Sequence, residues 1–336
     1  MTFSGNIQQK LVRIDRAILR VPNLAIHLQS EEDRKAFKVN KEEHLIPILA
    51  LEAKKALTGE KKDNSNENGW NEYQEPLLLQ LIAEELDIPV DTIADFELNL
   101  FDCQKASLGG AYSEFIHSSR LDNLASCFLA VQSLIEYTKE GKLADDEDVS
   151  LVALFDHEEV GSNSAVGAGS PIMRESVERI TAALNGVEGN AELYQSTLRK
   201  SFVLSVDQAH ALHPNYSSKH EQGHQPKMND GMVIKRNSNQ RYATNAITAF
   251  LIREIARKAG LPPVQEFVVR NDCGCGSTIG PVISSSTGIR AIDMGCPQLS
   301  MHSIRETMGV CDLTNGLALF KAFFETFREV DNSVEQ

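Results

Sequence analysis

An apolar run that ends abruptly in charged residues lies in the middle of this chain, at residues 151–162 (LVALFDHEEVGS). Residues 151–155 are all apolar, with β-branched and aromatic members, which predicts a strand buried on both faces of a largely parallel sheet. The letters DHEE follow directly. Ligands of open α/β sheets bind at the carboxyl ends of such strands, and adjacent carboxylates repel unless a cation neutralises them. The stretch predicts a metal or catalytic site, with a solvated loop as the alternative.

The composition is that of a soluble globular protein. The 336 residues are 42% hydrophobic and 24% charged, enough for one large or two ordinary domains with a sizeable core. The net charge is −14 and the pI is near 5.1, with no basic cluster, which argues against a nucleic-acid partner. An acidic substrate stays open, because local charge can oppose the net sign.

Six cysteines are scattered along the chain, and none of them forms a CxxC pair, so no zinc knuckle is predicted. Nothing resembles a secretory signal, and no apolar run of about 18 residues could cross a bilayer. We therefore expect a protein of the cytoplasm, with reduced thiols and no membrane partner.

The first third of the chain, residues 1–110, has β-leaning and irregular patterns, and Gly109-Gly110 marks a boundary after it. Pro47 is expected to kink or end the helix that surrounds it. The patterns predict strands at 11–15, 18–22 and 96–100, helices at 40–57 and 75–86, and a polar loop at 59–70.

From residue 111 to 330 the pattern alternates between strands and helices, and residues 331–336 form a tail. Alternation of this kind predicts an α/β fold, an α/β/α sandwich with a central mixed sheet, beside a smaller β-rich first domain. The expected strands are 151–155, 202–206, 267–269 and 289–293. The expected helices carry apolar faces at Leu124, Phe128, Val131 and Ile135; at Met173, Val177, Ile180 and Leu184; at Ile247, Phe250, Leu251 and Ile255; and at Leu313, Leu317, Phe320, Phe324 and Phe327.

Metal-type ligands lie at the ends of several segments: Asp122, the pair Glu158 and Glu159, Asp207 and His302. Each has an ordinary alternative, because Asp122 fits a helix N-cap, Asp207 fits a cap after its strand, and a lone histidine is usually structural. Taken together, carboxylates at two strand ends and an imidazole suit Zn²⁺. No compact motif such as HExxH supports this assignment.

Six blocks in register resemble the aspartyl aminopeptidases, which are di-zinc exopeptidases that remove N-terminal Asp or Glu from peptides. The similarity runs from about residue 11 to residue 327, nearly the whole chain. The blocks are RLDNL, DHEEVGS, SVDQAHALHPNY, VIKRNSNQRYATN, CGSTIGP and MHSIRE.

The resemblance implies two zinc ions. Carried over by position, Asp122 bridges both ions, Glu159 and His302 complete one of them, and Asp207 serves the other. Glu158 is then the general base that takes a proton from the attacking water. Paired metals about 3.5–4 Å apart suit this chemistry, because they polarise the scissile carbonyl and acidify water.

Substrate-binding residues follow from the same resemblance. Lys235 matches the residue that pairs with the acidic side chain of the substrate, with a surface lysine as the alternative. Tyr242 matches a tyrosine that approaches the tetrahedral intermediate. His27 matches a histidine that a neighbouring subunit contributes, and His210 and His213 are expected near the metal or in the substrate cleft.

The resemblance also implies a homo-oligomer. Residues 1–110 would be part of a dimerisation domain inserted into the catalytic domain, which would comprise residues 111–330. Family members form a dodecamer built from dimers with the active sites inside, which restricts substrates to peptides.

One family feature is missing from this chain. In the family, the histidine of an upstream HxD segment is another zinc ligand and its aspartate orients the site, but none of the nine histidines here is followed two positions later by Asp. We expect the first part of the catalytic domain to be absent, an apolar sheet face to be exposed, and the zinc at Asp207 to be weakened by several kcal/mol. Two alternatives stay open: a catalytically impaired fragment or subunit, and a related di-metal aminopeptidase of other specificity, against which Lys235 argues.

Overall fold

The computed structural model describes residues 7–51, 70–144, 146–186 and 190–334. Contacts divide the chain into two compact units, Met1–Gln104 and Lys105–Gln336. The dividing point lies a few residues before the predicted boundary at Gly109-Gly110. In the described residues, no helix combines the length and the apolar character that a membrane span needs.

Unit 1 has a small core around helix α3, Pro76–Leu86, which confirms the helix predicted at 75–86. Leu79, Ile82, Ala83 and Ile93 are buried in this core. Pro at the first position of α3 suits a helix start, since its missing N–H has no helical partner there. The other elements of unit 1 within its described residues are α1 Glu31–Lys35, η1 Ile26–Leu28, η2 Trp70–Tyr73 and η3 Val90–Thr92.

The β-rich character predicted for the first domain is wrong for its described residues. An isolated bridge joins Arg20 to Ile48, and residues 7–51 and 70–104 form no strand, so those predicted at 11–15, 18–22 and 96–100 are absent. Alternation makes a strand only where a second segment supplies a ladder of hydrogen bonds. The helix expected at 40–57 does not form within 40–51, and the rest of it lies outside the described residues, as does most of the expected loop 59–70.

Unit 2 contains a four-stranded mixed sheet, which confirms the α/β prediction. Its order is β3-β7-β5-β6, with β3 parallel to β7, β5 antiparallel to β7, and β5 parallel to β6. Three of these strands fall in or beside predicted segments, whereas β5 was not predicted. The bounds are β3 Phe202–Val206, β5 Val233–Arg236, β6 Gln265–Val268 and β7 Arg290–Gly295.

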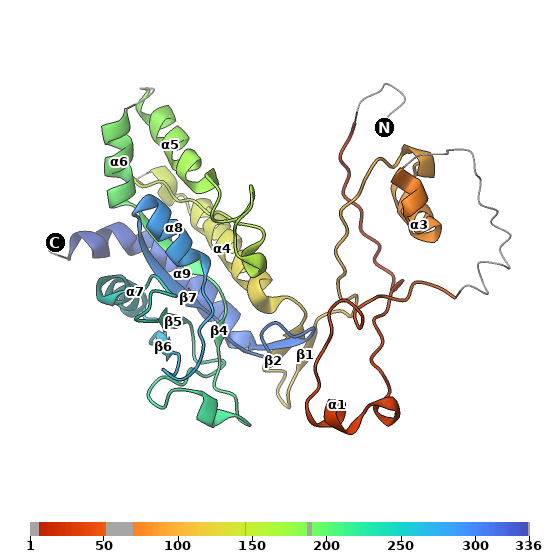
Figure 1. Cartoon of the computed structure of the whole chain (residues 1–336). Coiled ribbons are helices and arrows are strands. Elements are labelled where there is room, and N and C mark those ends of the chain that lie inside the picture. Colours follow the sequence, from red (N-terminus) through yellow and green to blue (C-terminus); the bar gives the residue numbers. More distant parts are fainter. Residues whose placement is uncertain (1–6, 52–69, 145, 187–189, 335–336) are drawn as a thin grey trace. The chain divides into compact units, whose positions relative to one another are not determined.

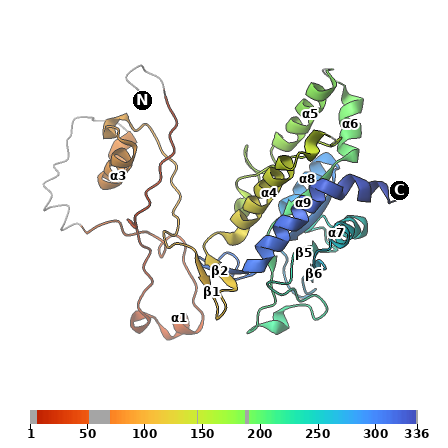
Figure 2. The same cartoon turned by 180° about the vertical axis from the view of Figure 1, so that it is seen from behind.

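Helices cover both faces of this sheet (Figures 1 and 2). Ile292 and Met294 of β7 are buried in one core with α4, α7 and α9, and α4 runs along α9. Asp293 points to the opposite face, because side chains alternate along a strand, and there Gly280 of α8 lies against its carboxylate. The helices are α4 Leu121–Lys139, α5 Ile172–Asn185, α6 Ala191–Lys200, α7 Ala246–Lys258, α8 Ile279–Thr287 and α9 Val310–Asn332, the last of which extends into the predicted tail.

A second sheet of five short strands lies in the same unit, in the order β1-β2-β9-β8-β4. All neighbours are antiparallel except β4 and β8. The strand β2 leads into α4, and the turn between β8 and β9 carries His302, so this sheet links two of the predicted metal ligands. The bounds are β1 Ser107–Gly109, β2 Phe115–Ser118, β4 Ala209–His210, β8 Pro297–Leu299 and β9 Glu306–Gly309.

The buried face of α4 is not the predicted one. Leu121, Ala125 and Leu129 point into the core with α9. These residues are spaced by four positions and those of the predicted face by three or four, and both spacings fit one face of a helix, so periodicity alone could not choose between the two stripes. The predicted stripe is exposed: Leu124 58%, Phe128 58%, Val131 38% and Ile135 38%.

The strand predicted at residues 151–155 is also absent. The segment has no ladder partner among the described residues, and Leu151 and Leu154 are exposed by 43% and 57%. An apolar run becomes a buried strand only when neighbouring strands satisfy its backbone on both sides. Such strands are not present in the described part of unit 2 beside this run.

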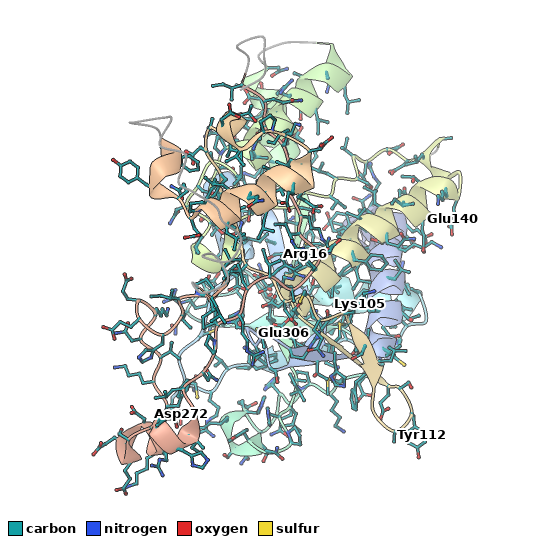
Figure 3. The ribbon with its side chains drawn as sticks, turned by 90° about the vertical axis from the view of Figure 1, so that its right-hand side faces the viewer. Arg16, Lys105, Tyr112, Glu140, Asp272 and Glu306 are labelled. Atoms are coloured by element: carbon teal, nitrogen blue, oxygen red, sulfur yellow. The ribbon has the colours of Figure 1, made fainter. Side chains whose placement is uncertain are left out.

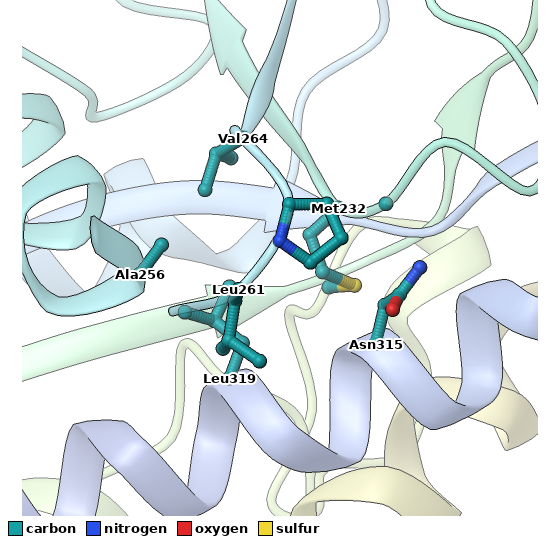
Figure 4. Close-up of a pocket in the computed structure, with 8 residues that line it drawn as sticks. Met232, Ala256, Leu261, Val264, Asn315 and Leu319 are labelled. Atoms are coloured by element: carbon teal, nitrogen blue, oxygen red, sulfur yellow. The ribbon is translucent and has the colours of Figure 1, made fainter. Parts of the chain in front are cut away.

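A small pocket lies between α7 and α9 (Figure 4). Met232, Ala256, Leu261, Val264 and Leu319 contribute apolar side chains to it. It shares no residue with the predicted site and is a packing gap within the core.

Candidate metal and catalytic site

Three separate segments bring the predicted metal ligands together. Asp122 lies in the first turn of α4, Glu159 in the 3-10 turn η5 (Glu158–Val160), and His302 in the turn between β8 and β9. The Nε2 atom of His302 lies 3.4 Å from Oδ2 of Asp122 and 3.3 Å from Oε1 of Glu159. One potential ligand atom from each residue falls within 4.8 Å of the others. Two carboxylate oxygens and an imidazole nitrogen at this spacing fit a zinc ion.

Asp122 does not cap its helix, contrary to the N-cap alternative. The N-cap is Arg120, and Asp122 lies inside the first turn with φ −82° and ψ 108°. Its neighbours tie this turn to the end of β3: Gln208 Nε2 donates to the Leu121 carbonyl at 3.3 Å, and Asn123 Nδ2 donates to the Val206 carbonyl at 2.8 Å. The Asp122 side chain is only 5% exposed and is therefore fixed beside the strand end.

The two glutamates are presented by a tight turn. His157, at φ 60°, and Gly161, at φ 101°, flank the turn, and Ser162 N–H donates to the His157 carbonyl at 2.8 Å. The His157 ring is held by Ser164 Oγ at 2.8 Å and is not among the clustered ligands. The turn leaves the Glu159 side chain 60% exposed and Glu158 half-buried.

Asp207 follows β3 directly and faces a built-in cation. Lys235 of β5 donates from Nζ to Asp207 Oδ2 at 2.9 Å and to the Gln208 carbonyl at 2.9 Å. The Lys235 side chain is 3% exposed and Asp207 is 19% exposed. A side-chain hydrogen bond joins Asp207 to Asp122, so the predicted ligands of both zinc ions are in contact.

The pKa values of these carboxyls diverge. Burial, followed by the charge of Asp207, raises the pKa of Asp122 to about 9. Burial also acts to raise the pKa of Asp207, but the Lys235 ammonium and the hydrogen bond from Asp122 outweigh it and hold that pKa below its ordinary value. Burial and the charges of Asp207 and Glu159 raise the pKa of Glu158. Strongly shifted, converging carboxyls are typical of functional sites.

The predicted substrate residues are placed as follows. The Tyr242 ring lies 5.1 Å from Lys235 Nζ, and Tyr242 is 5% exposed, which raises its pKa through burial. His210 lies on β4 with its ring 5.5 Å from that of Phe267. His213 N–H donates to His220 Nε2 at 3.0 Å. His27 belongs to unit 1, in η1, where it is exposed.

Glu306, Gln208 and Asn123 support the site but were not among the predicted residues. Glu306 lies in the MHSIRE block, and the other two directly follow predicted ligands. The sequence signals were adjacency to a predicted ligand for Gln208 and Asn123 and, for Glu306, a position four residues after His302. Spacing does not say what that glutamate holds. A second hollow, of about 330 Å³, is lined in part by Cys275 and by Arg241, which precedes Tyr242 in the sequence.

The model of the family described as aminopeptidase I zinc metalloprotease (M18) matches residues 2–324. A protein of Ricinus communis named "Probable aspartyl aminopeptidase" is 47% identical over 98% of this chain and 70% of its own length. The aspartyl aminopeptidase of Aspergillus oryzae is 45% identical over 99% of this chain and 71% of its own length. The chain thus spans about 70% of the length of these curated relatives.

Solved structures agree with the sequence comparisons. The cryo-EM structure of the Ape4 and Nbr1 complex matches with a TM-score of 0.90 at 40% identity, over 100% of this chain and 63% of that chain. The dodecamer of mApe1 from S. cerevisiae matches with a TM-score of 0.76 at 29% identity, over 95% of this chain and 65% of that chain. The family model covers nearly all residues, and the relatives share the fold that carries the clustered carboxylates and histidine. The chain therefore belongs to the M18 family of aminopeptidase I zinc metalloproteases.

Proposed function

We propose that this chain is a zinc-dependent aminopeptidase that removes an acidic residue from the N-terminus of peptides. The observation that carries the proposal is the convergence of Asp122, Glu159 and His302, with Glu158 and Asp207 next to them. The names of the relatives from R. communis and A. oryzae support the substrate class.

Asp122, Glu159 and His302 would hold the first zinc ion, and Asp122 and Asp207 would hold a second. Bound zinc supplies Lewis acidity, which polarises the scissile carbonyl and lowers the pKa of water. The fit rests on the donor set, since hard oxygens and one imidazole nitrogen are the ligands zinc takes in catalytic sites.

Glu158 is proposed as the general base. Its half-buried position and the neighbouring charges of Asp207 and Glu159 raise its pKa, so it accepts a proton more readily than an ordinary glutamate. Because Glu158 is adjacent in sequence to the proposed ligand Glu159, we expect its carboxylate to lie near the water that the metal would activate. The proton it receives is then available to the leaving amine.

Lys235 and Tyr242 are proposed to select and stabilise the substrate. An acidic side chain needs a cation in its pocket, and Lys235 is a buried cation at the site. The Tyr242 hydroxyl, with a pKa raised by burial, stays protonated and can donate to an oxyanion. We assign His210 and His213 to the walls of the substrate cleft.

Assembly into a homo-oligomer is part of the proposal. The similarity to the mApe1 dodecamer supports it, and residues 1–110 would be the dimerisation region that brings His27 to a neighbouring catalytic domain, residues 111–330. We place the protein in the cytoplasm.

A second candidate is a catalytically impaired subunit of the same family. Asp207, which would serve the second zinc, is already neutralised by Lys235, and no HxD histidine is available in the sequence to add a ligand. In this case the chain would keep one zinc ion and the ability to associate, without peptidase turnover.

The test is the release of free amino acid from matched peptides that begin with Asp, Glu, Asn or Leu, with zinc and then with a chelator. The proposal predicts chelator-sensitive release of Asp and Glu, with Asn and Leu far slower. A folded, zinc-loaded chain that releases none of the four would favour the impaired subunit. Equal release from Leu and Asp would contradict the acidic specificity.

A further inference from the structure

Glu306 is a buried carboxylate at the start of β9, and it contacts two of the three clustered ligands through their backbones. Oε2 accepts the N–H of Asp122 at 2.9 Å, and Oε1 accepts the N–H of His302 at 2.8 Å. The residue is 2% exposed (it is labelled in Figure 3). Asp122 is 184 residues away in the sequence, so one carboxylate joins two distant segments.

The donors recorded for Glu306 within the described residues are neutral. Besides the two backbone amides, Gln298 Nε2 donates to Oε1 at 3.3 Å. Burying a carboxylate costs free energy unless its oxygens accept hydrogen bonds. Hydrogen bonds to a charged group are also strong, so the two amides are held firmly in the positions in which they donate to Glu306. Each oxygen accepts a different amide, so the separation of the two carboxylate oxygens sets the distance between the backbone nitrogens of Asp122 and His302.

We propose that Glu306 is a positioning residue that fixes Asp122 and His302 at zinc-binding distance, an inference that rests on the proposed zinc site. It acts through the ligands and does not touch zinc or substrate. Groups that orient metal ligands are typically worth about 10–100-fold in metal affinity, even though they lie outside the ligand set. The same two hydrogen bonds keep the β8–β9 turn against the start of α4 when no ion is bound.

Two substitutions separate positioning from charge. Glu306→Gln keeps the length of the side chain, but its amide group can accept only one of the two N–H groups and loses the negative charge. Glu306→Asp keeps the charge but is one methylene shorter, so it cannot reach both amides. If Glu306 acted through its charge alone, the Glu306→Asp variant would bind zinc as tightly as the wild type. If Glu306 positions the ligands, both variants should bind zinc more weakly.

Asp312 provides a matched control. It is also a fully buried carboxylate that accepts two backbone amides, Asn229 N–H at 2.7 Å and Gly231 N–H at 3.1 Å. None of its partners is a clustered ligand. Asp312→Asn therefore tests how much any buried carboxylate of this kind affects zinc binding through general stability.

The experiment measures hydrogen exchange of the metal-free full chain and zinc affinity by competition with a chromophoric chelator. Each Glu306 variant should speed exchange at one or both of the Asp122 and His302 amides and weaken zinc binding by about 10–100-fold, and Asp312→Asn should do neither. Unchanged exchange at both amides, or unchanged zinc affinity despite faster exchange, would overturn the proposal. A wild-type chain that binds no zinc would refute the proposed function, while the exchange data would still decide whether Glu306 holds the two segments.

Discussion

The two halves of the candidate site differ in what balances their negative charge. Asp207 has a built-in cation, because Lys235 Nζ lies 2.9 Å away and is almost fully buried. Asp122 and Glu159 face the His302 imidazole instead, at 3.4 and 3.3 Å. The pKa directions record the difference: that of Asp122 is raised to about 9, and that of Asp207 is lowered.

This contrast shows where an external cation is needed. In the metal-free chain a proton on Asp122, whose pKa is raised to about 9, relieves the repulsion among the carboxylates of this half, and a zinc ion at Asp122, Glu159 and His302 would replace that proton. A zinc ion at Asp207 must instead compete with Lys235. The two halves are therefore expected to bind zinc with unequal strength.

The largest effect on activity is expected from a change at Glu158, because charged groups of both halves shift the pKa of this residue. Glu158→Gln should lower the rate of Asp release by about 10²–10⁴-fold, because a positioned base is lost while the shape is kept. Zinc content should stay at the wild-type level, since Glu158 is not one of the three clustered ligands. Retention of activity within a few-fold, at equal zinc content, would remove Glu158 from the mechanism.

Asymmetry between the halves is tested next with Asp122→Asn and Asp207→Asn. The first should weaken the tightest zinc by more than about 100-fold, since losing a ligand costs more than losing a group that orients one. The second should weaken the binding of that ion less, by about 10–100-fold at most, because Asp207 acts on it only through its hydrogen bond with the ligand Asp122. Zinc titration reports both values, with exposed Glu178→Gln as a charge-matched control. Equal losses of zinc affinity in the two variants would contradict the expected difference between the two halves of the site.

Lys235→Leu removes the built-in cation. The preference for Asp over Leu substrates should fall by about 30-fold, the equivalent of roughly 2 kcal/mol for a buried charge pair. The uncompensated Asp207 should at the same time gain affinity for a second zinc. Measurements of kcat/KM on the two peptides and of bound zinc check both outcomes. Unchanged selectivity would show that Lys235 serves Asp207 alone.

The smallest effect concerns pH. With a pKa of about 9, Asp122 is protonated near pH 7 in the metal-free chain and must lose that proton to bind zinc. Zinc affinity should rise up to about tenfold per pH unit from pH 7 towards 9. The stability of the metal-free fold changes with pH in the opposite direction. Because the pKa of Asp122 is raised on folding, its contribution to the free energy of unfolding is fully present at pH values below 3.8, the ordinary pKa of Asp, and is lost as the pH rises through 9.

Calorimetry in buffers of different protonation enthalpy measures the proton released on zinc binding. The Asp122→Asn variant serves as the control, because it has no proton to release at that position. Zinc binding by the wild type with no proton release would place the pKa of Asp122 far lower than its burial indicates.

Periodicity in the sequence predicted three strands of the four-stranded sheet (β3, β6 and β7) and four of the helices α4–α9 (α4, α5, α7 and α9), but not their partners. The apolar runs at β3 and β7 and the face of α9 lie where the patterns placed them. The predicted face of α7 is only half right, because Leu251 and Ile255 are buried whereas Ile247 and Phe250 are exposed by 55% and 46%. The run at 151–155 is at least as apolar as β3 but has no ladder partner among the described residues, and a local pattern carries no information about a neighbouring strand. The two apolar stripes of α4 were equivalent in the sequence, and only α9 decides between them.

For the candidate site, family-like blocks indicated which residues to consider, whereas their spatial relations came from tertiary contacts. Asp122 looked like a helix cap because its neighbours have helical periodicity, yet Gln208 and Glu306 hold its turn in place from distant segments. The pairing of Lys235 with Asp207 joins β5 to the end of β3, and no spacing rule connects residues that meet across a sheet.

The location of bound zinc tests the account most directly. Crystals of the full chain soaked in limiting zinc would be measured on both sides of the zinc absorption edge. The account predicts the strongest anomalous peak between Asp122, Glu159 and His302, with a weaker peak or none beside Asp207 and Lys235. A dominant peak at Asp207, or zinc bound only away from all three clustered ligands, would contradict it.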